Sequence, residues 1–213
     1  GMLENGRHWA TFHDPFPKPS YLFASANGDL ELLEDHYTTG SGKEVALRIW
    51  TEQGKASKVG YAMESLKKAM KFDEDVFGCE YDLDTFNIVA TSKFSFGAME
   101  NKGLNIFKDK FVLVDPKITT DQGHHQVDLV VGHEYFHNYS GNRVTLANFF
   151  NISLKEGLTV SREQMFTAHV TSDAIDRIDN VQNLRAGQFP EDDSPLAHAV
   201  MTKEAMSVTN LYS

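Results

Sequence analysis

Residues 127–144 read VDLVVGHEYFHNYSGNRV and contain the pattern H-E-x-x-H between His133 and His137. The apolar run that leads into the pattern predicts a helix over residues 126–139. Because residues four apart on a helix share one face, the two imidazoles are expected to point at one place. This spacing suits a tetrahedral zinc ion and predicts a metal site.

Two glutamates complete the expected site. Glu134 is rotated by about 100° from His133 around the helix, so it is expected to act as a base over the open side of the metal. Zinc lowers the pKa of a coordinated water to about 7, and a neighbouring carboxylate can take its proton. Glu156 lies on the next predicted helix and is expected to be the third ligand. Three protein ligands with one open position are typical of a catalytic zinc.

The remaining histidines are weaker candidates for metal ligands. The chain has nine histidines, so a bare H-E-x-x-H can arise by chance. The distal Glu156 and the apolar run before His133 argue against coincidence. We expect His124, His125 and His169 to be surface or loop residues without a metal role.

The composition is that of a globular protein with an acidic balance. Apolar residues make up 41% and charged residues 23% of the chain, and the formal net charge is −10. Such a balance argues against nucleic acid and anionic membranes as partners, since both attract basic patches. No apolar run approaches the length of a spanning helix, about 18 residues. Cys79 is the only cysteine, which excludes an internal disulfide and favours the reducing cytoplasm.

Hydrophobic periodicity predicts a β-rich first half and an α-rich second half, hence an α+β fold. Three prolines before residue 20 exclude a helix there, and an extended segment with a turn at Asn27-Gly28 is expected. The stretch from Ser172 onward is expected to be partly irregular. Strands are predicted at 44–50, 86–92 and 104–115, and helices at 57–77, 126–139 and 148–170.

Three motifs together resemble one enzyme family. GAMEN at residues 97–101, HEYFH at residues 133–137 and the distal Glu156 resemble the zinc aminopeptidases of the gluzincin group. The longer strings FGAMENKGLNIF, VGHEYFHN and SLKEGLTV are similar to the same family, and the resemblance covers essentially the whole chain.

The resemblance implies a truncated, thermolysin-like (zincin) catalytic domain preceded by the end of a β domain. Residues 1–29 would be the C-terminal end of the β domain, and residues 30–213 the first part of the catalytic domain. In this family a tyrosine binds the oxyanion of the tetrahedral intermediate. Tyr212 does not match it, and the matching tyrosine is expected about five residues past the end of this sequence. The chain is therefore expected to be a fragment of a longer parent and of low activity by itself.

The resemblance also implies a function, namely zinc-dependent removal of N-terminal residues from peptides, of the alanyl aminopeptidase type. Glu100 would bind the α-ammonium of the substrate, with Glu156 as a second contact. Backbone groups at Gly97 and Ala98 would contact the scissile region, and Met99 would line the first side-chain pocket. The expected cofactor is one Zn²⁺.

Asn101 completes the motif and is expected to order its loop. The expected partners are peptides with a free N-terminus and the remainder of the parent chain.

Two other functions remain open from the residues. A thermolysin-type endopeptidase shares H-E-x-x-H and the distal glutamate, although GAMEN speaks against it. Comparison of free with N-acetylated peptides separates the two activities. The other alternative is a zinc-binding but non-catalytic fragment, which a zinc measurement beside a turnover measurement identifies.

Overall fold

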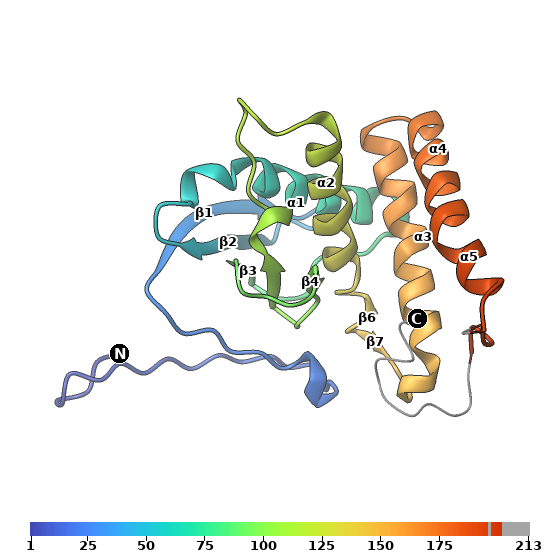
Figure 1. Ribbon diagram of the computed structural model, residues 1–213. Coiled ribbons are helices and arrows are strands. Elements are labelled where there is room, and N and C mark those ends of the chain that lie inside the picture. Colours follow the sequence, from blue (N-terminus) through green and yellow to red (C-terminus); the bar gives the residue numbers. More distant parts are fainter. Residues whose placement is uncertain (196, 202–213) are drawn as a thin grey trace.

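The computed structural model describes residues 1–195 and 197–201, and the fold is α+β as predicted (Figure 1). A mixed sheet and two helices form one part of the molecule, and further helices stand beside them. Tyr212 lies outside the described residues. Among those described, no helix combines the length and the apolar character that crossing a bilayer requires.

The sheet has five strands in the order β1-β2-β3-β5-β4. β2 and β3 are parallel, as are β3 and β5, whereas β1 and β4 join antiparallel at the two edges. β4 is the first part of the GAMEN motif, so this motif lies at an open edge of the sheet. The bounds are β1 Leu30–Thr38, β2 Glu44–Glu52, β3 Thr85–Thr91, β4 Ala98–Met99 and β5 Leu104–Lys108.

The first helix has the predicted position. α1 spans Gly60–Phe72 and continues as a π-turn over Asp73–Phe77. Gly78 ends it with φ of 67°, the left-handed conformation that glycine adopts without a steric penalty. As α1 connects the parallel strands β2 and β3, it is the crossover helix of this part of the sheet.

The two helices that were expected to carry the site are present with shifted starts. α2 spans Asp121–Phe136 and begins earlier than predicted, because the Thr120 hydroxyl caps it by accepting from the Gly123 N–H. α3 spans Ile152–Val170 and follows a 3₁₀ turn over Phe149–Asn151.

One prediction of local structure was wrong in its second half. The strand expected at 104–115 ends at Lys108, and a 3₁₀ turn over Asp109–Phe111 follows. Val112 and Val114 are buried there without strand pairing, so their apolar character reflects packing alone. The stretch after Ser172 is helical up to Asp192, with α4 at Asp173–Asn183, a π-turn at Leu184–Gln188 and α5 at Phe189–Asp192. Residues 193–195 and 197–201 are irregular, so the expectation of a partly irregular stretch holds for this end only.

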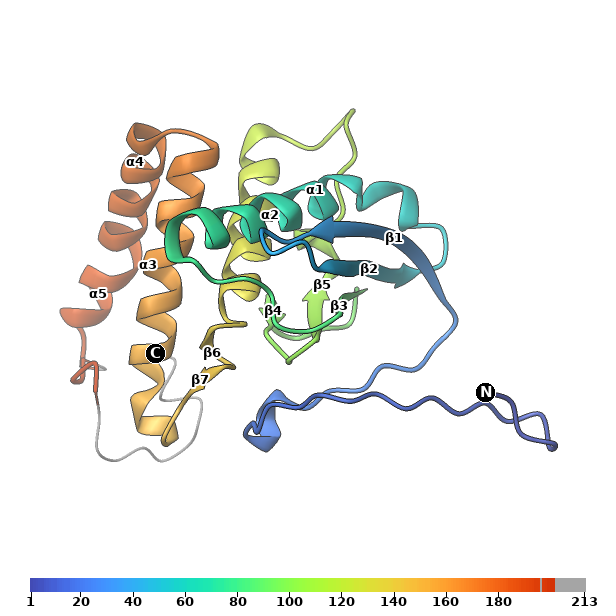
Figure 2. The ribbon, with the colours of Figure 1, turned by 180° about the vertical axis from the view of Figure 1, so that it is seen from behind.

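Residues 1–29 form an arm that runs alongside the body before it enters β1 (Figure 2). The arm contains one isolated β-bridge and a 3₁₀ turn at Ser20–Leu22, and the sharp turn expected at Asn27-Gly28 is only a bend. Leu22 is buried against the body. The division into domains at residues 29 and 30 stays a prediction.

The core lies between the sheet and the two helices α1 and α2. α3 joins it through Phe166, whose ring lies against Gly132 on α2. A Cβ on Gly132 would come within 2.7 Å of this ring, so the two helices approach closely only because residue 132 has no side chain. Prominent fully buried side chains are Leu47, Ile49, Leu66, Met70, Ile88, Phe107, Tyr135 and Phe136.

Replacement of this glycine is expected to separate the two helices. Gly132→Ala should lower the free energy of unfolding by roughly 1–3 kcal/mol, since overpacking forces the backbone to shift. Urea unfolding followed by circular dichroism measures the effect. Gly157→Ala on α3 is the matched control: nothing lies within 4 Å of its Cβ position. The control should be neutral or stabilising, by about 1 kcal/mol at most. An equal loss in both variants would contradict the packing argument.

Candidate metal centre

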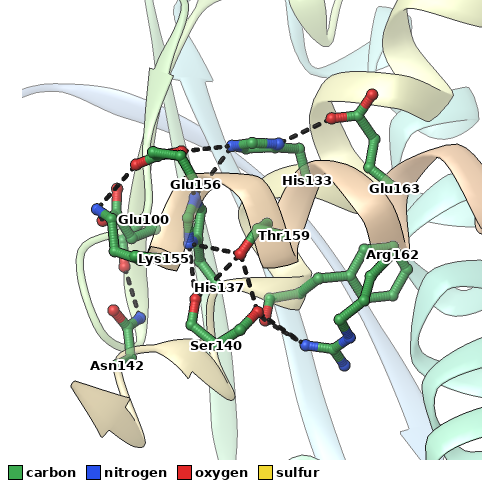
Figure 3. Close-up of polar contacts among 11 residues, drawn as sticks. Glu100, His133, His137, Ser140, Asn142, Lys155, Glu156, Thr159, Arg162 and Glu163 are labelled. Atoms are coloured by element: carbon green, nitrogen blue, oxygen red, sulfur yellow. Dashed lines mark hydrogen bonds and ion pairs between the residues drawn. The ribbon is translucent and has the colours of Figure 1, made fainter. Parts of the chain in front are cut away.

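The structure brings His133, His137 and Glu156 together at one point (Figure 3). The Nε2 atoms of the two imidazoles lie 3.0 Å apart. Oε2 of Glu156 lies 3.4 Å from Nε2 of His133 and 3.3 Å from Nε2 of His137. Ligands about 2.1 Å from a tetrahedral metal lie about 3.4 Å from one another, so these three separations are close to those of a metal site.

The outer nitrogens of both rings are held by hydrogen bonds. Nδ1 of His137 donates to the carbonyl of Ser140 at 2.9 Å, with the Thr159 hydroxyl at 3.1 Å. Nδ1 of His133 lies 2.8 Å from a carboxylate oxygen of Glu163. A carbonyl and a carboxylate can only accept, which places the ring hydrogens on Nδ1 and leaves the Nε2 lone pairs facing inward.

The centre therefore requires a positive charge. Two lone pairs and a carboxylate oxygen converge, and they repel one another unless a cation lies among them. Burial alone would lower the pKa of His133, but its hydrogen bonds to Glu156 and Glu163 outweigh burial and raise that pKa to about 10. Two imidazoles and a carboxylate are a donor set that zinc accepts, so these residues fit a metal.

Glu134 lies beside this centre without belonging to it. Its side chain is buried, and its Oε2 has no hydrogen-bond partner among the described residues. Burial raises the pKa of this carboxyl to about 8, and the negative charges of Glu100 and Glu156 act in the same direction. A buried carboxyl with a raised pKa and an unpartnered oxygen is suited to proton transfer.

Glu100 lies on the other side of Glu156. It is 4% exposed and forms a buried ion pair with Lys155 on α3. The Lys155 ammonium also lies 3.0 Å from Oε1 of Glu156. The side-chain amide of Asn142 donates to the Glu100 carbonyl at 2.8 Å, which fixes the backbone of the motif.

The rest of the GAMEN motif lies along the sheet edge. Gly97 is exposed, and its carbonyl accepts from the Lys108 N–H. Ala98 and Met99 form β4 and are half-buried. The Asn101 side-chain amide donates to a carbonyl of the N-terminal arm at 3.3 Å, in agreement with a loop-ordering role. A Cβ at Gly97 would lie 3.4 Å from the ring of Phe111, which is an ordinary van der Waals contact, and a close approach by substrate there stays a prediction.

A buried network holds the C-terminal end of α2 in place. Arg162 on α3 pairs with Asp73 at the end of α1 and donates to the Phe136 carbonyl at 2.9 Å and the Ser140 hydroxyl at 3.0 Å. Burial raises the pKa of Asp73 to about 6, although Arg162 opposes the rise. The backbone on both sides of His137 is thereby fixed to two other helices.

Sequence reasoning missed several residues that support the centre. Glu163 follows Glu156 by two helical turns and shares its face, a spacing that could have indicated it. Lys155 and Thr159 gave no signal, because their roles depend on which elements pack against α3. Of the histidines predicted to lie at the surface or in a loop, His169 is exposed on α3, whereas His124 and His125 are half-buried on α2. None of the three joins the metal group among the described residues.

The fold and the metal centre together define the class of protein to which this chain belongs. A mixed sheet lies beside one helix with H-E-x-x-H and a second with a distal glutamate, as in metal-dependent peptidases of the H-E-x-x-H type. Residues 61–213 match the model described as the Peptidase family M1 domain. The chain belongs to this family.

The relatives include several bacterial aminopeptidases. The chain is 53% identical over 213 residues to aminopeptidase N of Haemophilus influenzae and 51% identical over 213 residues to that of Escherichia coli. Each comparison includes 100% of this chain and 24% of the relative. Legionella pneumophila aminopeptidase A, solved in complex with aspartic acid, superposes with a TM-score of 0.85 at 36% identity, over 94% of this chain and 22% of that one. The chain thus spans about a quarter of the length of these relatives.

Removal of the Glu163 charge is expected to weaken metal binding. Glu163→Gln keeps the shape but removes the carboxylate that orients His133, and such outer partners typically contribute 10–100-fold in affinity. Competition with a fluorescent chelator measures the zinc dissociation constant. Glu64→Gln, an exposed carboxylate on α1 that pairs with Lys67, is the control and should leave the constant unchanged. Equal constants for wild type and Glu163→Gln would contradict this role.

Metal binding is expected to release protons. Below pH 8 the metal-free chain holds a proton on His133, with a pKa of about 10, and one on Glu134, with a pKa of about 8. A dication at the centre disfavours both protons, so binding at pH 7 should release about two from these side chains, in addition to the fraction released by a coordinated water with a pKa of about 7. Calorimetry in buffers of different ionisation enthalpy counts them. The Glu134→Gln variant should release one proton fewer at pH 7. An unchanged number of protons would contradict the proton assigned to Glu134.

Proposed function

We propose that this chain carries the metal and amine sites of a zinc-dependent aminopeptidase, which removes N-terminal residues from peptides. The observation that carries the proposal is the joint placement of His133, His137 and Glu156 around one point, with Glu100 close by. The names of the relatives support the same activity.

A bound Zn²⁺ would polarise the scissile carbonyl and make an attacking water more acidic. Glu134 takes a proton from this water as it attacks, and then donates the proton to the leaving amine. Its buried position beside the centre and its Oε2, which has no partner among the described residues, suit both directions of transfer. His133, His137 and Glu156 would hold the ion.

Glu100 provides the specificity for a free N-terminus. An α-ammonium that reaches Glu100 gains a charge-assisted hydrogen bond in a buried setting. An acylated or internal residue offers no charge there and does not gain this bond. The strand edge at β4 can bind the extended peptide through backbone hydrogen bonds.

Substrates and cellular location are part of the same proposal. Peptides with a free N-terminus are the proposed substrates, and a cytoplasmic location accords with the single cysteine, Cys79.

The test measures amine recognition by binding as well as by turnover, since the chain spans about a quarter of its relatives. Alaninamide and N-acetylalaninamide are titrated into the zinc-loaded chain by calorimetry. The free amine should bind about 10–100-fold more tightly, because a hydrogen bond to a charged group contributes about 1.5–3 kcal/mol. Glu100→Gln should abolish this difference.

Two controls make the result specific. Glu64→Gln should preserve the preference for the free amine. Glu134→Gln should retain zinc and the preference but lose any hydrolysis of alanine p-nitroanilide. Equal affinities of the wild-type chain for the two amides would refute the amine anchor. Turnover on N-acetylated peptides alone would indicate an endopeptidase.

A further inference from the structure

The ammonium of Lys155 lies between two carboxylates that belong to different parts of the site. It forms an ion pair with Oε1 of Glu100 on the GAMEN segment and lies 3.0 Å from Oε1 of Glu156 on its own helix. Each contact uses one oxygen of the carboxylate. Lys155 thus joins the predicted amine anchor directly to a predicted metal ligand.

Because Lys155 contacts one oxygen of Glu156, the two carboxylate oxygens have different partners. Oε2 faces the imidazoles at 3.3 and 3.4 Å, while Oε1 faces the Lys155 ammonium. A carboxylate held in this way offers one oxygen to a metal. Without Lys155, Glu156 would be free to turn about its terminal bond, or to approach a metal with both oxygens.

The Lys155 side chain has little freedom to leave this position. It is 2% exposed, and the ring of Tyr21 lies 5.3 Å from its ammonium. Gly141, with φ of 130°, makes room for its stem: a Cβ there would come within 2.8 Å of Lys155 Cδ. An ammonium that left Glu100 would also break a buried ion pair, which is strongly destabilising. Lys155 is therefore a fixed part of the site.

We propose that Lys155 is a positioning residue that couples the metal centre to the amine anchor, by orienting the carboxylates of Glu156 and Glu100 together. The proposal rests on the proposed function for its amine readout, but its metal readout is independent of that function. Lys155 itself touches neither the metal nor the substrate. An incoming α-ammonium joins it at Glu100 rather than displacing it.

The test replaces Lys155 in the 213-residue chain and follows two binding reactions. Lys155→Met retains most of the stem and removes the charge. We expect the zinc dissociation constant to rise at least ten-fold, as for other groups that orient a ligand. The preference of the zinc-loaded chain for alaninamide over N-acetylalaninamide should fall at least ten-fold as well, at zinc concentrations that saturate the variant.

The matched control is Lys55→Met. The Lys55 ammonium also bridges two carboxylates, Glu52 and Asp109, each at 2.8 Å, but neither belongs to the site. This variant should keep the zinc constant and the amine preference of the wild type. Circular dichroism establishes that each variant is folded. Lys155→Gln, which keeps one hydrogen bond, is the second variant if Lys155→Met does not fold, and the same two losses are expected.

Three results would overturn the proposal. Unchanged zinc and amine binding in a folded Lys155 variant would make the residue merely structural. Tighter binding of zinc or of the free amine would make Lys155 a competing cation. Loss of zinc affinity alone, or of the amine preference alone, would mean that Lys155 does not couple the metal centre to the amine anchor. If the wild-type chain shows no amine preference, the proposed function fails, and the zinc constants of the variants still decide whether Lys155 orients Glu156.

Discussion

The close approach of α2 to α3 is the constraint on which the site depends. Gly132 on α2 lies against the ring of Phe166 on α3, and a residue with a side chain would hold the helices apart. The turn after Gly132 begins the H-E-x-x-H motif, so the same contact that packs the core sets the distance from the imidazoles to Glu156. Arg162 then fixes the last carbonyl of α2 from the side of α3. Packing and chemistry are thus determined by one helix pair.

Charge is arranged around this contact in layers. At the centre, the lone pairs of His133 and His137 and one oxygen of Glu156 face the same point. Around them, Glu163 and the Ser140 carbonyl accept from the outer ring nitrogens, and the Lys155 ammonium holds the second oxygen of Glu156. Because each inner group is oriented by an outer one, the centre is organised before any ion arrives. The conformational entropy of these side chains is therefore lost on folding and not on metal binding.

The sequence predicted what depends on periodicity and missed what depends on packing between elements. The spacing of His133 and His137 placed two imidazoles on one helical face, and the first helix ends where it was predicted to end, at residue 77, with Gly78 after it. The strand expected at 104–115 was wrong in its second half, because a buried valine gives the same pattern in a turn as in a strand. Lys155 could not be foreseen, since its role exists only where α3 meets the GAMEN edge.

The arm at the start of the chain is tied to the Glu100 end of the site. The Leu22 carbonyl accepts from the Lys102 N–H, the Tyr21 carbonyl from Asn101, and the Tyr21 ring lies beside Lys155. A force on the arm would therefore be transmitted through Tyr21 and Lys155 to the carboxylates that Lys155 contacts. The arm that leads into β1 is thus mechanically linked to Glu100 and Glu156.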